Sequence, residues 1–319
     1  MLAREGLCQS SNRAAGILAV TATIWWAPMV PAAQEPVATF RSGVDLVRVS
    51  AVVRDDEGRF VRNLAKADFE VLDDGRPREI TDFRQDSTGI SVALLIDASG
   101  SMEHTLPEAR EAATHVLSWL EARDEAAIFT FDTGLAQITP FASGMKALPE
   151  SVQKLTPFGA TSLHDAIARV AARVGEREGR RRAVVVFTDG RDNASRMAPA
   201  EVSAIASSID VPVYLFAAVP SIDNPSSGFV KGGEGASLSG PLADLATWTG
   251  GHVFVASTPG ARSSSAKQIA DELRHQYLMA FESSGKPGWH PLVVRTRDKD
   301  LIVRARSGYI AGQSRPSSD

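Results

Sequence analysis

From residue 91 onward, short and almost wholly apolar runs alternate with longer segments whose apolar residues recur at helical spacing. The apolar runs lie at 92–96, 183–188 and 211–217. The segments of helical spacing lie at 107–121, 163–174 and 199–209. Uninterrupted apolar runs are typical of parallel strands covered on both faces. The alternation therefore predicts an α/β fold, doubly wound, with a mostly parallel sheet and helices on both of its faces.

The residues before and after this region follow β-strand patterns instead. Residues 44–54 alternate apolar and polar side chains, and Asp73-Asp74-Gly75 separates two β-prone runs as a hairpin turn would. Late strands are expected at 277–282, 290–297 and 301–306. Because neither set can form a core alone, we expect the early and late strands to pair. The α/β domain would then be inserted in a small antiparallel β domain built from N- and C-terminal strands.

The first 33 residues have the features of an export signal. Arg4 and Arg13 supply positive charge, residues 14–26 are mostly apolar, and Val30-Pro31-Ala32-Ala33 offers small residues for cleavage. The apolar stretch is shorter than the ~20 residues that a membrane span needs. We therefore expect a cleaved signal peptide and a periplasmic or secreted protein. An uncleaved N-terminal anchor is the alternative, and it would be the only link to a membrane.

These features predict the following organisation of the chain: a signal peptide at 1–33, N-terminal strands of the β domain at 34–88, the α/β domain at 89–282, C-terminal strands at 283–313 and a disordered tail at 314–319. The only cysteine, Cys8, lies inside the signal. The mature protein would therefore have no disulfide, no thiol nucleophile and no cysteine-based zinc site.

Charge and motif content argue against nucleic acid and nucleotide as ligands. The formal net charge is −4, and the one basic cluster, Arg180 to Arg182, is expected to be a solvated loop. Neither a Gly-x-x-x-x-Gly-Lys nor a Gly-x-Gly-x-x-Gly phosphate-binding loop occurs. Ser99 lies in Ala-Ser-Gly-Ser rather than Gly-x-Ser-x-Gly, so a hydrolase nucleophile is not indicated.

Polar side chains follow the predicted strands at the points where each strand ends. Asp97, Ser99 and Ser101 follow the first buried strand, Thr161 opens the helix at 163–174, and Asp189 follows the strand at 183–188. Ligands of open α/β sheets bind outside the carboxyl ends of the strands, so we expect these five side chains to converge. All five offer oxygen, and two carboxylates with neutral hydroxyls suit Mg²⁺, with Mn²⁺ or Ca²⁺ as alternatives.

The pattern Asp-x-Ser-x-Ser, a later Thr and Thr-Asp-Gly resembles the metal-ion-dependent adhesion site (MIDAS) of von Willebrand factor type A domains. Asp97, Ser99, Ser101, Thr161 and Asp189 fill all five positions, and the resemblance covers about residues 89 to 282. The flanks resemble those of exported bacterial VWFA-related proteins. The resemblance implies that the hydroxyls contact the metal directly, that the aspartates often act through water, and that a partner's Asp or Glu completes the octahedron. It implies adhesion or complex assembly rather than turnover, so we expect a protein partner and no enzyme activity.

Several alternatives stay open from the sequence. The five side chains could be ordinary turn and helix-cap residues. His104 and His164 are expected to face solvent, and Asp132 and Asp192 are expected to be solvated loop acids. A metal-dependent hydrolase and a structural subunit of an envelope assembly are the rival functions.

Overall fold

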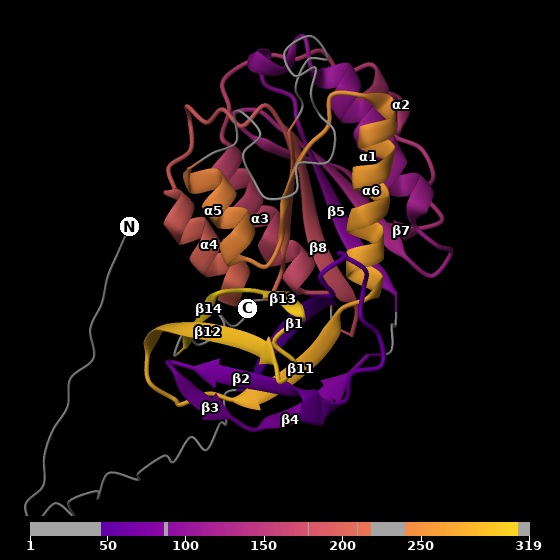
Figure 1. Ribbon diagram of the computed structural model, residues 1–319. Helices are drawn as coiled ribbons and strands as arrows, with labels where there is room; N and C mark the ends of the chain where they lie inside the picture. Colours follow the sequence, from indigo (N-terminus) through magenta and orange to yellow (C-terminus); the bar gives the residue numbers. More distant parts are fainter. Residues whose placement is uncertain (1–45, 86–88, 178, 209, 218–239, 312–319) are drawn as a thin grey trace, which may run out of the picture. The chain divides into compact units, whose positions relative to one another are not determined.

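The computed structural model describes residues 46–85, 89–177, 179–208, 210–217 and 240–311 (Figure 1). The predicted signal peptide at 1–33 and the predicted tail at 314–319 lie outside the described residues. No helix among the described residues is long and apolar enough to cross a membrane.

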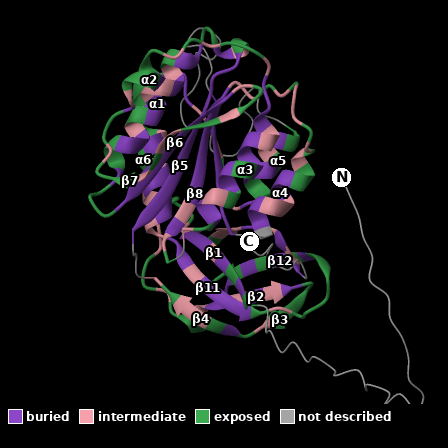
Figure 2. Ribbon diagram, turned by 180° about the vertical axis from the view of Figure 1, so that it is seen from behind, coloured by how far each residue is buried: buried purple, intermediate pink, exposed green. Residues whose placement is uncertain are grey.

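A six-stranded sheet in the order β10-β9-β8-β5-β6-β7 forms the centre of the α/β region. Its strands are β5 (Ile90–Asp97), β6 (Glu125–Phe131), β7 (Leu135–Ser143), β8 (Arg181–Thr188), β9 (Val213–Ala217) and β10 (Val253–Val255). All neighbouring pairs are parallel except β6 and β7, which are antiparallel. Every residue of β5 is buried, as its apolar run predicts (Figure 2). The predicted doubly wound, mostly parallel fold is confirmed.

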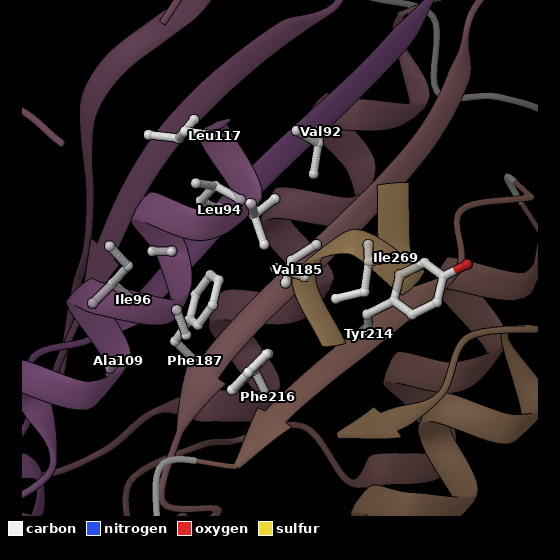
Figure 3. Close-up of a cluster of buried hydrophobic side chains, with 14 of the residues drawn as sticks. Val92, Leu94, Ile96, Ala109, Leu117, Val185, Phe187, Tyr214, Phe216 and Ile269 are labelled. Atoms are coloured by element: carbon white, nitrogen blue, oxygen red, sulfur yellow. The ribbon is translucent and has the colours of Figure 1, made fainter. Parts of the chain in front are cut away.

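Helices cover both faces of this sheet. They are α1 (Leu106–Trp119), α2 (Glu150–Gln153), α3 (Leu163–Gly175), α4 (Pro199–Ser208), α5 (Pro241–Trp248) and α6 (Pro259–Arg274). Alternate residues of β5 divide between two cores. Val92, Leu94 and Ile96 pack with α1 and α6 (Figure 3). Ala93 and Leu95 pack with α3, α4 and α5, which cover the other face of the sheet (Figure 1). Burying each Val, Leu or Ile stabilises the fold by about 1.5–3 kcal/mol, so these two cores hold the strand ends in place.

Strands from both ends of the chain form two antiparallel sheets, as predicted. One has the order β13-β1-β11-β4, with β1 (Leu46–Arg54), β4 (Ile80–Arg84), β11 (Tyr277–Glu282) and β13 (Ile302–Ala305). The other has the order β14-β12-β2-β3, with β2 (Phe69–Asp73), β3 (Arg76–Arg78), β12 (Gly288–Thr296) and β14 (Gly308–Ala311). Asp74 and Gly75 form the β2–β3 turn with φ values of 51° and 73°, which a type I′ hairpin turn requires.

Strand β11 connects the last helix of the α/β region to the antiparallel sheets. Strand β11 pairs with β1 and β4 and buries Tyr277, Met279 and Phe281 in the core of the β sheets. The α/β region therefore ends with α6. The expected pairing of the late strand at 277–282 with the early strands is confirmed.

A buried carboxylate on α6 joins the helix to the antiparallel strands. Glu272 is fully buried and accepts a hydrogen bond of 2.8 Å from Arg54 on β1, and it also pairs with Arg304 on β13. Burial opposes ionisation of Glu272, but the two arginines outweigh it and lower its pKa. The ion pairs therefore keep a charged group inside the protein, where an unpaired charge would be strongly destabilising.

Candidate metal centre

The loop after β5 brings three of the predicted ligands together. Asp97 ends β5 with its side chain fully buried, and the backbone N–H of Ser99 donates to Asp97 Oδ1 at 2.9 Å. The hydroxyl oxygens of Ser99 and Ser101 lie 3.1 Å apart, within hydrogen-bond distance. The short 3₁₀ turn η2 (Gly100–Met102) places the second serine over the first. The motif Asp-x-Ser-x-Ser thus folds into one compact turn.

Two backbone hydrogen bonds tie this loop to the segment before Thr161. The N–H of Gly100 donates to the carbonyl of Gly159 at 3.0 Å, and the N–H of Phe158 donates to the carbonyl of Ala98 at 2.9 Å. Gly159 has a φ of +85°, a conformation that glycine adopts without strain, and this lets the chain turn into Thr161. Thr161 is 1% exposed and lies two residues before α3, next to the N-cap residue Ser162.

The loop after β8 closes the arrangement from the other side. Thr188 donates its hydroxyl proton to Asp97 Oδ2 at 2.6 Å. Asn193 Oδ1 accepts from the N–H of Thr161 at 2.8 Å, and the N–H of Asn193 donates back to the Thr161 carbonyl at 3.1 Å. Three segments that are far apart in the sequence are therefore joined in a closed ring of hydrogen bonds.

Asp189 follows β8 and lies partly exposed at this ring. Its Oδ1 accepts from the N–H of Arg191 at 3.1 Å, and its Oδ2 lies 3.5 Å from Arg191 Nε. The negative charge of Asp189 acts on Asp97, and it is one of the influences that raise the pKa of Asp97.

The Asp97 carboxyl has an unusual proton affinity. Burial raises its pKa to about 6, although the hydrogen bonds from Thr188 and Ser99 favour the charged form, and the Asp189 charge adds to the increase. A buried carboxylate that is costly to ionise gains from a nearby cation. The electrostatics of the site therefore favour a bound positive charge.

The donor set fits a hard divalent cation. Adjacent ligands of an octahedral Mg²⁺ site lie about 3.0 Å apart, because the metal–oxygen distance is about 2.1 Å and neighbouring bonds meet at right angles. The separation of 3.1 Å between the Ser99 and Ser101 hydroxyls matches that edge. The described residues include no group of three or more His, Cys, Asp or Glu side chains around a common point.

The sequence around these residues is similar to a known domain family. The family model of the von Willebrand factor type A domain matches residues 92–191, a range that contains all five predicted ligands. The chain carries a von Willebrand factor type A (VWA) domain. No curated protein is similar enough in sequence to match the chain.

Solved structures with similar folds come from several sources. An aerotolerance-related membrane protein from Bacteroides fragilis is 20% identical, with 58% of this chain and 98% of that chain covered and a TM-score of 0.47. A von Willebrand factor type A protein from Catenulispora acidiphila is 13% identical, with coverages of 83% and 74% and a TM-score of 0.45. Proximal thread matrix protein 1 from the mussel byssus, solved with a zinc-occupied MIDAS motif, is 17% identical, with coverages of 63% and 49% and a TM-score of 0.45. The assignment of the VWA domain rests on the family match rather than on these structures.

Two histidines lie near the predicted ligands of the VWA domain, and they differ. His104 is exposed, as expected. The expectation that His164 faces solvent is wrong, because its side chain is 14% exposed and its Nδ1 lies 2.7 Å from Asp192 Oδ2. The same carboxylate oxygen accepts from the backbone N–H of His164 at 2.9 Å. His164 therefore ties α3 to the loop after β8.

The two nearby aspartates are hydrogen-bonded within their loops rather than simply solvated. Asp132 Oδ1 accepts from the N–H of Gly134 at 2.7 Å and so closes the turn between β6 and β7. Asp192 accepts a hydrogen bond from the N–H of Ser195 at 3.0 Å. Burial opposes ionisation of Asp192, but the hydrogen bonds from Ser195 and His164 outweigh it and lower its pKa. Both acids shape the rim of the VWA site.

Sequence reasoning assigned no role to two residues of this site. Thr188 directly precedes Asp189 in the Thr-Asp-Gly motif, and that position could have indicated its contact with Asp97. Asn193 carries no comparable signal, because its contact with Thr161 depends on two loops meeting across 32 residues of sequence.

Proposed function

We propose that the VWA domain binds one divalent cation through Asp97, Ser99, Ser101, Thr161 and Asp189, and through it an exposed Asp or Glu of a protein partner. Mg²⁺ is the proposed ion, with Mn²⁺ and Ca²⁺ as alternatives. The observation that carries the proposal is the ring of hydrogen bonds that joins the three ligand-bearing segments, together with the 3.1 Å separation of the two serine hydroxyls.

The charge at the site supports binding of an anionic group. Two carboxylates balance a doubly charged ion, and the remaining ligands are neutral hydroxyls, so the bound ion would keep an affinity for a further carboxylate. The N-terminus of α3 follows Thr161 and adds positive dipole at the same edge. When bound, the ion supplies a coordination position for the partner's acid. The residues of this chain hold the ion and exclude bulk water from Asp97.

We propose that the domain binds rather than catalyses. Asp132 and Asp192 accept hydrogen bonds from backbone N–H groups of their own loops, so neither is placed as a free general base. Activity towards generic phosphoester or peptide substrates in the presence of Mg²⁺ would contradict this part of the proposal and favour a metal-dependent hydrolase.

Calorimetric titration with Mg²⁺ tests the cation site. Asp97→Ala should abolish Mg²⁺ binding, and Thr161→Val, which keeps the size of the side chain and removes the hydroxyl, should weaken it. Asp82→Ala is the matched control, because Asp82 lies on β4 and, among the described residues, its carboxylate pairs with the exposed neighbour Arg84 alone. Circular dichroism should show that all three variants fold. Wild-type Mg²⁺ affinity in Asp97→Ala would overturn the proposal.

Peptide binding tests the partner chemistry. An immobilised glycine–serine peptide with one Asp should bind the wild-type protein in Mg²⁺ and lose that binding in EDTA, whereas the same peptide with Asn should not bind. The protein should stay folded in EDTA. Global unfolding on chelation would instead favour a purely structural ion, as in a subunit of an envelope assembly.

We propose further that the domain acts outside the cytoplasm, in the periplasm or as a secreted protein, on the basis of the signal pattern at 1–33. Fusing these residues to alkaline phosphatase, which needs an oxidising compartment to form its disulfides, should give an active enzyme. An inactive, cytoplasmic fusion would contradict export.

A further inference from the structure

A second concave site lies beside the proposed cation site. It is a pocket of about 260 Å³ between the β6–β7 turn, the first turns of α3 and the loop after β8. Its lining includes Thr133, Leu135, Ser162, Arg169, Arg196 and Met197. Ser162 directly follows Thr161, so the pocket begins one residue from a proposed cation ligand.

Two arginines make the pocket positive. Arg169 on α3 and Arg196 in the loop after β8 are both exposed, and neither guanidinium forms an ion pair or hydrogen bond with the described residues. The acid of the pocket, Asp165, is already engaged, because its carboxylate accepts from the backbone N–H groups of Arg196 and Met197 at 2.9–3.2 Å. Asp165 thus holds the loop in place and leaves two arginines for a ligand.

The shape and apolar lining indicate which anion the pocket would take. Guanidinium groups bind carboxylates through paired N–H donors, which gives both affinity and orientation. Leu135, Ala166 and Met197 line the same pocket and offer an apolar surface to the methylene groups of a side chain. Methionine adapts its shape to the group it contacts. A glutamate side chain, with two methylenes before its carboxylate, combines both requirements.

We propose that this pocket is a second subsite, which takes an acidic side chain, preferably Glu, from the same partner segment whose other acid binds the cation. The inference rests on the proposed function and adds to it: the partner presents two acidic residues, one for the ion and one for Arg169 and Arg196. The first acid sets the dependence on the cation, and the second sets the choice among acidic segments.

Peptides that differ only in the second acid test the subsite. The probes are immobilised glycine–serine peptides with one fixed Asp and a Glu, Ser or Lys placed at successive positions along the chain. In Mg²⁺, at least one Asp/Glu spacing should bind about fivefold more tightly than its Asp/Ser counterpart, and the Asp/Lys peptide should bind more weakly than both. The gain should decrease at high salt, because exposed charge pairs are screened.

Variants of the protein locate the effect. Arg169→Gln with Arg196→Gln should lower the affinity for the Asp/Glu peptide to that of Asp/Ser, and calorimetry should show unchanged Mg²⁺ affinity. Arg173→Gln is the matched control: it removes one charge from the same helix, but Arg173 bonds Gln137 and lies outside the pocket lining. The control should keep the full gain.

The outcomes separate the subsite from the proposed function. Equal binding of Asp/Glu and Asp/Ser peptides at every spacing, or a gain that persists in the double variant, would overturn the subsite and leave cation-dependent binding intact. Failure of the single-acid peptide to bind in a Mg²⁺-dependent way would contradict the proposed function, and the subsite would fall with it.

Discussion

Replacing Asp97 by Asn should stabilise the protein in the absence of divalent cations. The folded protein holds the pKa of Asp97 at about 6 rather than near 3.8, mainly because of burial. The unfolded chain therefore releases this proton more readily than the folded one. The stabilising effect of the proton is fully present below pH 3.8 and is lost as the pH rises through about 6. At pH 7 the ionised carboxylate consequently costs about 3 kcal/mol of folding free energy.

The side-chain amide of Asp97→Asn, which carries no charge, removes that cost of ionisation but loses one hydrogen bond. It is neutral at every pH and keeps an oxygen to accept from the Ser99 N–H, but its NH₂ group does not accept the Thr188 hydroxyl proton as Oδ2 does. Rerouting that hydrogen bond costs about 1 kcal/mol, so the net gain should be about 2 kcal/mol. For a protein of this size, that corresponds to an increase in Tm of roughly 3–4 °C.

The assay is thermal and urea unfolding in EDTA over a range of pH. Asp97→Asn should be more stable than wild type by about 2 kcal/mol at pH 7. Below about pH 4, where the wild-type carboxyl is protonated, the variant should be less stable by about 1 kcal/mol, which is the cost of the rerouted hydrogen bond. In saturating Mg²⁺ the order should reverse, because ligand at 100 times its Kd adds about 2.7 kcal/mol to wild type alone. The control Asp82→Asn should stay within about 0.5 kcal/mol of wild type throughout. Lower stability of Asp97→Asn in EDTA at pH 7 would refute the argument from burial.

Three further predictions follow from contacts in the structure. Mg²⁺ affinity should fall up to tenfold per pH unit below about pH 6, because Asp97 takes up a proton there. Calorimetry in buffers of different ionisation enthalpy would detect the coupled proton release, and a pH-independent affinity would contradict the prediction. Glu272→Gln should lower the free energy of unfolding by about 3–5 kcal/mol in urea, because it leaves two arginines facing a neutral group. The control Asp271→Asn on the same helix, which loses an exposed pair with Lys267, should change it by less than about 0.5 kcal/mol. Gly251→Ala should destabilise the protein by more than about 1 kcal/mol, because the added Cβ would lie 2.0 Å from the Val213 carbonyl oxygen. Unchanged stability in urea unfolding would mean that the backbone before β10 can move away from β9 at no cost.

The division of the chain into strands and helices was largely predictable because it is a local property. The run Val92 to Ile96 is apolar at every position, which is typical of a strand buried on both faces, and the structure buries all of it. The turn Asp74-Gly75 likewise carries its conformation in its residue types. The pairing of Tyr277 to Glu282 with the early strands was predictable for another reason, because neither set of strands could form a core alone.

The candidate site divides in the same way. Asp97, Thr161 and Asp189 could be chosen from the sequence because each follows or precedes a regular element, and the carboxyl ends of parallel strands meet at one edge. Whether these residues bind a cation stays a prediction. The solvent exposure expected for His164 was wrong, because no local pattern reveals that Asp192, 28 residues later, lies within 2.7 Å of its ring.

By itself, the sequence determined the periodicity of the strands and helices, the order in which they occur, and the oxygen-only chemistry at the strand ends. Only the tertiary structure decided the proton affinity of Asp97, the roles of Thr188 and Asn193, and the presence of a positive pocket beside Thr161. The physical reason is the range of the interactions. Backbone conformation follows from neighbouring residues, whereas desolvation, charge–charge contacts and pockets arise between segments that meet only when the sheet has assembled.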